Sequence, residues 1–190
     1  MIFFSCKKDD TNNIDIPIKD LSEQYIIEND SIIQFMKTHF YNYDDFSNLS
    51  STESPEIIFD SIIGDNLNKN PIYDQVSTLQ ISVKDANDND VNHNLYYHII
   101  REGIGDNPTV ADSVFVSYKG LLFDGSSFDS RKNPIWMEAK NLIRGFQEFL
   151  PLLKKGDVKV NNDGTYDFID FGIGFVCLLY TSDAADDRSC

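Results

Sequence analysis

The run from Ser113 to Ser130 constrains the fold of this chain more than any other stretch. It reads Ser-Val-Phe-Val-Ser-Tyr-Lys-Gly-Leu-Leu-Phe-Asp-Gly-Ser-Ser-Phe-Asp-Ser. Its first part alternates side chains at the two-residue period of a strand, which we place at residues 112–123. Asp124-Gly125 then stands between two apolar segments, and Asp-Gly is a strong signal for a tight turn. The run therefore predicts a strand, a tight turn and a second strand.

Further elements are expected on both sides of this hairpin. Strand patterns begin near Val76 and return over Asn94 to Arg101, after a polar turn at residues 85–90. A short helix is expected from a cap at Asn141 to Leu150, where Pro151 follows. Because strands and one short helix alternate in this order, we expect an α+β fold in which an antiparallel sheet wraps around the helix.

The N-terminal part of the chain has a helical pattern instead. Apolar residues recur at roughly helical spacing from Asp20 to Phe40, although Glu28 to Ser31 interrupts them, so one or two short helices fit. Asp20 with Glu23, or Ser31 with Gln34, could form the capping pair. Residues 41–74 look rich in loops. We therefore expect an N-terminal extension of helices and loops at residues 19–74, followed by a domain at 75–176.

The charge of the chain excludes some partners. Lysine and arginine number 16 against 31 acidic residues, which gives a net charge of -15. Nucleic acids bind through Lys and Arg at their phosphates, so no nucleic-acid partner is expected. The three histidines lack the spacing of metal ligands, and the Asp85-to-Asp90 segment lacks the glycine of a calcium loop. We therefore expect no metal and no cofactor.

The N-terminus contains a candidate lipidation site at Cys6. The sequence Met-Ile-Phe-Phe-Ser-Cys-Lys-Lys-Asp-Asp resembles the end of a bacterial lipoprotein signal peptide, although its apolar run is shorter than a complete one. The resemblance, which is closest to lipoproteins of the Bacteroidetes, implies an acylated Cys6, a signal remnant and tether at residues 1–18, and an exported protein anchored to the outer membrane. The alternative is an unmodified thiol.

The C-terminus departs from ordinary protein sequence after Val176. The string Cys-Leu-Leu-Tyr-Thr-Ser-Asp-Ala-Ala-Asp-Asp resembles the translation of a transposase-type sequencing adapter. We therefore expect residues 177–190 to be an artefactual tail, and we infer no disulfide from Cys177 and Cys190. The alternative is a natural acidic tail.

Together the hairpin run and the later Leu-Ile-Arg-Gly-Phe at 142–146 resemble the FKBP-type peptidyl-prolyl cis/trans isomerases. The resemblance implies an aromatic pocket that holds proline, with Ile143 offering its backbone amide and Phe146 standing where the family usually has tryptophan. It also implies a closing strand that this sequence lacks, so the chain as it stands is expected to be unstable and inactive. The implied catalytic residues are Tyr118, Phe128, Asp129, Ile143 and Phe146, and the implied substrate-binding residues are Leu142 and Trp136.

Each of these aromatic residues would be an ordinary core residue if it stood alone, since such side chains are usually buried for packing. Their common spacing favours the isomerase. Such an enzyme would need no nucleophile, because an apolar pocket that favours the twisted amide lowers the barrier to rotation. We expect the protein to act on proline-containing polypeptides and to assist the folding of envelope proteins. The alternative function is a binding module that docks a proline-containing segment without turnover.

Overall fold

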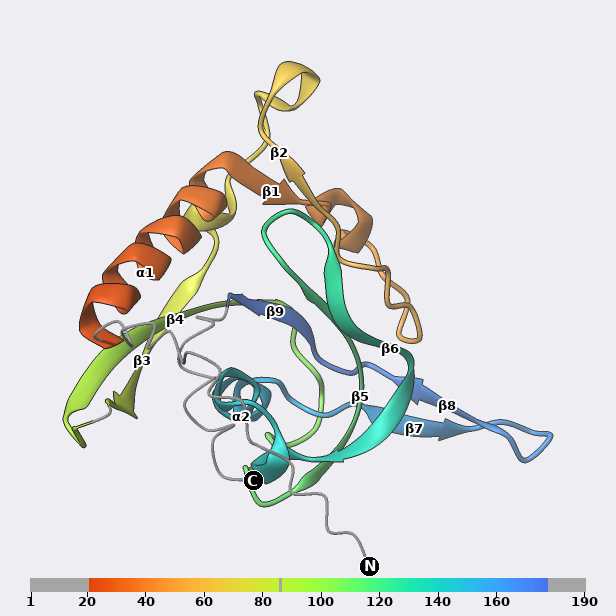
Figure 1. Cartoon of the computed structure of the whole chain (residues 1–190). Helices are drawn as coiled ribbons and strands as arrows, with labels where there is room; N and C mark the ends of the chain where they lie inside the picture. Colours follow the sequence, from red (N-terminus) through yellow and green to blue (C-terminus); the bar gives the residue numbers. More distant parts are fainter. Residues whose placement is uncertain (1–20, 86, 178–190) are drawn as a thin grey trace, which may run out of the picture.

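The computed structural model describes residues 21–85 and 87–177 (Figure 1). It confirms the expected α+β class. The helices are α1 (Leu21–Thr38) and α2 (Arg144–Phe149), with 3-10 turns η1 (Tyr43–Phe46), η2 (Gly64–Asn66), η3 (Ile72–Asp74), η4 (Ala139–Asn141) and η5 (Leu150–Leu152). The strands are β1 (His39–Tyr41), β2 (Phe59–Ser61), β3 (Ser77–Lys84), β4 (Asp90–Arg101), β5 (Ser113–Leu121), β6 (Ser127–Glu138), β7 (Asp157–Val160), β8 (Tyr166–Ile169) and β9 (Ile173–Cys177).

The N-terminal helical pattern forms one continuous helix, α1, rather than two. The Ser31 hydroxyl donates to the carbonyl of Ile27 at 2.8 Å, one turn earlier, so Ser31 lies inside the helix and does not cap it. The expected pairing of Ser31 with Gln34 as a cap is therefore wrong. Asp20, the other expected cap, lies outside the described residues.

Strands β3, β4 and β9 form an antiparallel sheet in the order β3-β4-β9. The β3–β4 turn falls in the polar segment at 85–90, where the carboxylate of Asp85 accepts hydrogen bonds from the backbone amides of Asn87 and Asn89. Strand β9 pairs with the other side of β4, with Phe175 opposite His98. This sheet forms one side of the core.

The core joins this sheet to the N-terminal extension. Ile32 and Met36 of α1 are buried with Tyr96 of β4 and Phe175 of β9. Tyr41 of β1 and Ile72 of η3 complete the group. The Tyr96 hydroxyl also donates to the Asn29 side chain of α1 at 3.0 Å. Each Å² of apolar surface removed from water contributes about 25 cal/mol, so burial of these side chains stabilises the packing of α1 on the sheet.

The predicted hairpin is present as β5 and β6, and the two strands pair antiparallel. Its turn lies at Asp124-Gly125, where Gly125 has a φ of +83° and donates to the carbonyl of Leu122 at 2.9 Å. The register is interrupted between Val116 and Tyr118 by a bulge that bends the ribbon. Figure 1 shows α2 inside the curve of this ribbon.

Helix α2 is short and is anchored by its C-terminal side. Phe149 is 5% exposed, and its ring lies against Gly174 of β9, where an added Cβ would come within 3.1 Å of it. The expected cap at Asn141 is wrong, because Asn141 belongs to η4 and its side-chain amide donates to Glu138. The helix begins instead after Ile143, whose carbonyl accepts hydrogen bonds from the amides of Phe146 and Gln147.

Candidate functional site

Tyr118 and Asp129 meet across the β5–β6 hairpin. The Tyr118 hydroxyl donates to Oδ2 of Asp129 at 2.5 Å, while Oδ1 accepts from the amide of Ser130 at 2.8 Å. The pairing places the two residues on one face, since Tyr118 and Gly120 share a face of β5 and Asp129 lies opposite Gly120. The hairpin turn thus brings together two residues that are eleven positions apart.

This hydrogen bond reinforces the charge states that both groups have at neutral pH. The bond to Asp129 is the main cause that raises the pKa of Tyr118, with burial second, and the same bond lowers the pKa of Asp129. Arg131 adds a weak ion pair to Asp129 at 3.5 Å. Tyr118 donates as a protonated hydroxyl to the ionised Asp129, and this hydrogen bond holds its ring in place.

Phe128 lies against the backbone of β5 at Gly120, which has no side chain to keep the ring away. A Cβ added at Gly120 would come within 2.4 Å of Cζ of Phe128. The Phe128 side chain is 59% exposed, so its ring is a surface that a ligand can contact. Sequence reasoning did not single out Gly120, although it stands in the Tyr-Lys-Gly motif two residues after Tyr118.

Helix α2 contributes the next aromatic ring. The rings of Phe146 and Tyr118 meet edge to face, with centroids 5.7 Å apart and an interplanar angle of 73°. Ile143 is 41% exposed and precedes the helix, and Leu142 is half-buried beside it. The Ile143 amide has no backbone acceptor among residues 21–85 and 87–177. The structure thus brings Tyr118, Asp129 and Phe146 into contact and puts Ile143 at the start of the same helix.

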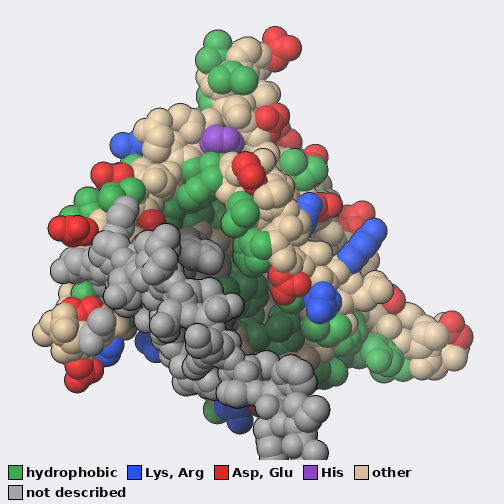
Figure 2. All heavy atoms as spheres, viewed as in Figure 1, with side chains coloured by type: hydrophobic (Ala, Val, Ile, Leu, Met, Phe, Trp, Pro, Cys, Tyr) green, Lys and Arg blue, Asp and Glu red, His purple; other side chains and the backbone are tan. Residues whose placement is uncertain are grey.

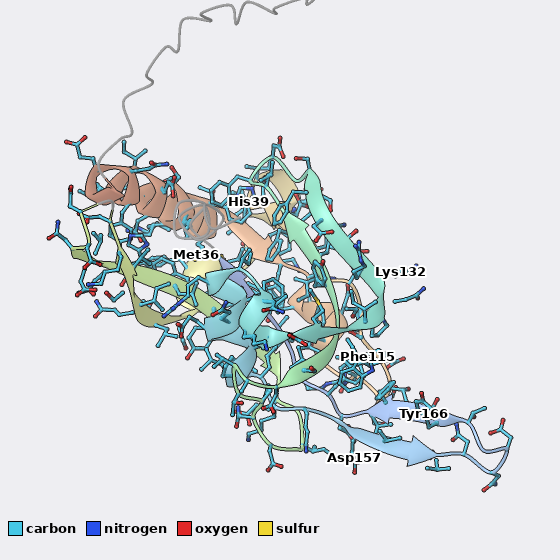
Figure 3. The ribbon with its side chains drawn as sticks, turned by 60° about the horizontal axis from the view of Figure 1, so that its bottom comes forward. Met36, His39, Phe115, Lys132, Asp157 and Tyr166 are labelled. Carbon is cyan, nitrogen blue, oxygen red and sulfur yellow. The ribbon has the colours of Figure 1, made fainter. Side chains whose placement is uncertain are left out.

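Trp136 is not brought into this group. Its ring lies on Phe115 with centroids 5.2 Å apart, and Phe115 in turn contacts Phe168 of β8 at 5.1 Å. Phe115 and Tyr118 are three positions apart on β5, so their side chains point to opposite faces of the strand. Trp136 is paired with Phe115 and therefore lies on the face away from Tyr118, where it is 70% exposed. Figure 3 shows Phe115 where the ribbon approaches the β7–β8 hairpin.

The surface of the described part of the molecule has hollows. Figure 2 shows hydrophobic side chains gathered in a hollow near the middle of the face it draws. Hollows of about 440 and 760 Å³ are lined by residues between Asp44 and Pro55 and by residues of α1 with Phe123, respectively. In the described part of the chain, no group of three or more His, Cys, Asp or Glu side chains is arranged to hold a metal ion.

Both expectations for the chain ends fall largely outside the described residues. Cys6 and the tether at 1–18 lie outside them, as do residues 178–190. Cys177 is described as the last residue of β9, and burial raises the pKa of its thiol to about 12. Neither described helix has the length and hydropathy that a membrane span requires.

Comparison with known proteins shows that the hairpin and helix lie in a stretch that is similar to a known family. Residues 105–170 match the family model of the FKBP-type peptidyl-prolyl cis-trans isomerases. The chain is 39% identical over 67 residues to the peptidyl-prolyl cis-trans isomerase Mip of Coxiella burnetii. The aligned region covers 34% of this chain and 29% of that protein. It is 42% identical over 65 residues to a probable FKBP-type isomerase, FkpA, of Neisseria meningitidis, covering 33% of this chain and 24% of that protein.

A third relative is the outer membrane protein MIP of Legionella longbeachae, 38% identical over 65 residues, covering 33% of this chain and 28% of that protein. The chain thus spans less than a third of the length of these curated relatives. Residues 105–170, which match the FKBP-type peptidyl-prolyl cis-trans isomerase model, contain every candidate residue of the site.

Proposed function

We propose that this protein catalyses cis/trans isomerisation of the peptide bond before proline in polypeptide clients. The observation that carries the proposal is the cluster of Tyr118, Asp129 and Phe146, held by a 2.5 Å hydrogen bond and a ring contact inside the matched domain. Phe128 lies on β6 beside Asp129, Ile143 directly precedes α2, and both are exposed. These residues offer a proline ring an aromatic surface and offer its peptide carbonyl a backbone donor.

Isomerisation of an X-Pro bond requires little more than an apolar surface and a hydrogen-bond donor. Rotation about the X-Pro bond is slow because amide resonance opposes it, with a barrier of about 18–20 kcal/mol. An apolar environment favours the twisted amide, which has lost resonance and charge separation, over the planar one. A donor such as the Ile143 amide holds the carbonyl that precedes proline while the bond turns. No covalent intermediate is required.

A protease-free isomerisation assay with a proline-containing tetrapeptide tests the proposal. It is run on the 190-residue chain and on the chain extended downstream along its own gene, because the resemblance implies a further strand. Tyr118→Ala and Asp129→Ala should lower kcat/KM by about tenfold or more, since each removes a contact at the site. Tyr166→Ala, which removes an exposed ring on β8, is the matched control. Equal activity in all variants would contradict the assignment.

A non-catalytic binding module is the second candidate. Phe146 gives the site a smaller platform than the tryptophan usual at this position, and Phe128 is 59% exposed, so a peptide could dock without a fully enclosed amide. Calorimetry on the same peptide separates the two. Binding that depends on Tyr118, with no turnover in either the 190-residue or the extended chain, favours the module.

We further propose that the protein is exported, held at the outer membrane by acylated Cys6, and acts on folding envelope proteins. The lipoprotein-like sequence around Cys6 supports this location, as does the relative named as an outer membrane protein. A single acyl chain binds membranes only weakly, so a firm anchor needs more than one. Metabolic labelling with a fatty acid should mark the wild type and not Cys6→Ser. Equal labelling, or an unlabelled wild type, would contradict the anchor.

A further inference from the structure

The side chain of Gln147 reaches back from α2 to the segment that precedes the helix. Its Nε2 donates to the carbonyl of Leu142 at 2.6 Å and to the carbonyl of Lys140 at 3.0 Å. A glutamine amide has two N–H donors, so both can be used here. The Gln147 backbone amide donates to the carbonyl of Ile143 at 3.1 Å. One residue thus binds three successive parts of the segment at 140–143.

The hydrogen bond to Leu142 has a consequence for the next residue. The carbonyl of Leu142 and the N–H of Ile143 belong to one peptide unit, which is planar and trans. In such a unit the two groups point in opposite directions. Because Gln147 holds the oxygen on the helix side, it also fixes the direction of the Ile143 N–H, which points away from Gln147.

Helical hydrogen bonds do not perform this task. Leu142 and Ile143 have extended backbones, with ψ angles of 163° and 148°, so this peptide lies before the first turn of α2. A hydrogen bond to the carbonyl also polarises its peptide and makes the attached N–H a better donor. Gln147 therefore both orients the amide and strengthens it.

We propose that Gln147 is a positioning residue that aims the Ile143 amide at the carbonyl of a bound proline-containing peptide. The inference rests on the proposed function for its ligand. Its structural part, that Gln147 orders the Ile143 peptide, can be measured without any ligand. Gln147 itself need not contact the substrate.

Three variants of the full chain test this. Gln147→Leu keeps the size of the side chain and removes both donors. Gln147→Glu replaces the donors with a carboxylate that repels the two carbonyls until it is protonated. Gln75→Leu is the matched control, because the Gln75 amide also donates to two backbone carbonyls, those of Asn70 and Pro71, both at 3.1 Å, in the N-terminal extension.

The first readout is the order parameter of the Ile143 amide from nitrogen-15 relaxation, without ligand. Gln147→Leu should lower it from about 0.85 towards 0.6, whereas Gln75→Leu should leave it unchanged. An Ile143 amide that stays as ordered in Gln147→Leu as in Gln75→Leu, in a chain that melts normally, would overturn the proposal.

The second readout is the response to a proline-containing tetrapeptide. In the wild type, the Ile143 amide proton should shift downfield on titration, and Gln147→Leu should weaken binding or kcat/KM by roughly fivefold to thirtyfold, as expected for one or two lost hydrogen bonds. The affinity or kcat/KM of Gln147→Glu should rise towards that of the wild type as the pH falls towards 5, whereas that of Gln147→Leu should not.

The outcomes separate this proposal from the proposed function. Loss of order at Ile143 in Gln147→Leu, without any peptide response in the wild type of either the 190-residue or the extended chain, would support the orienting contact and reject its ligand, and with it the isomerase. A wild type that binds peptide through Tyr118 while Gln147→Leu binds equally well would reject the proposal and leave the isomerase standing.

Discussion

At the scale of single residues, the site depends on a missing side chain. Gly120 leaves room for the ring of Phe128, and a Cβ there would come within 2.4 Å of Cζ. We expect Gly120→Ala to displace this ring. Because Phe128 is 59% exposed, the ring can turn towards solvent, and the free energy of unfolding should fall by only about 1 kcal/mol or less. Peptide affinity should fall much more, which calorimetry measures.

A second substitution on the same strand controls for general damage to β5. Ser117→Ala changes an exposed residue of the same strand, and it should alter neither stability nor affinity. If Gly120→Ala binds peptide as the wild type does, Phe128 is no part of the binding surface.

At the scale of elements, the tip of the β5–β6 hairpin contacts the N-terminal helix. The rings of Phe123 and Phe35 lie with centroids 5.0 Å apart. A double-mutant cycle with Phe35→Leu and Phe123→Leu should give a coupling energy of about 0.5–1.5 kcal/mol in urea unfolding. Replacing Phe123→Leu in the cycle by Leu122→Ala should reduce the coupling to a few tenths of a kcal/mol. Equal coupling in both cycles would mean that the hairpin tip does not dock on α1.

The elements also show how far sequence reasoning reached. The alternation of β5 and the Asp-Gly turn predicted a hairpin, and the contact of Tyr118 with Asp129 follows from it. The position of Trp136 could not be predicted in this way. Tyr118 lies opposite Arg131 but Val116 lies opposite Ile135, so β6 carries extra residues at a bulge, and a two-residue period cannot reveal it.

The same limit applies to contacts far apart in sequence. The apolar pattern predicted a helix at α1, but it appeared to break between Glu28 and Ser31. The helix continues through this stretch, where the Ser31 hydroxyl donates to the carbonyl of Ile27 one turn earlier. The pattern also could not tell that Ile32 packs with Tyr96 and Phe175, because partners across a core leave no periodic mark. Gln147 escaped prediction for a similar reason, since its role depends on loop geometry.

At the scale of the whole molecule, the contact between α1 and the β3-β4-β9 sheet contains a buried histidine. His93 of β4 is 0% exposed and stacks on Tyr25 of α1, with centroids 4.6 Å apart and rings 2° from parallel. Neither ring nitrogen has a hydrogen-bond partner among the described residues. Burial lowers the pKa of His93, and the nearby Glu28 carboxylate opposes this only in part.

This burial predicts how stability changes with pH. An unfolded histidine has a pKa of about 6.5, so as the pH falls through that value the unfolded chain takes up a proton that folded His93 does not. The contribution of His93 to the free energy of unfolding should therefore be complete above about pH 7.5. It should decrease as the pH falls through 6.5 towards the lowered pKa of the folded state. His98, whose pKa burial also lowers, contributes with the same sign.

Urea unfolding between about pH 8 and 5.5 tests this, since the carboxylates whose pKa is lowered, such as those of Asp85 and Asp129, stay ionised there. His93→Phe keeps a ring on Tyr25 and removes the titrating group, so its stability should vary less with pH than that of the wild type. Adding His98→Phe should flatten the dependence further. A His93→Phe profile parallel to the wild type would mean that His93 is protonated equally in the folded and unfolded chain, and that α1 is not sensitive to acid through this contact.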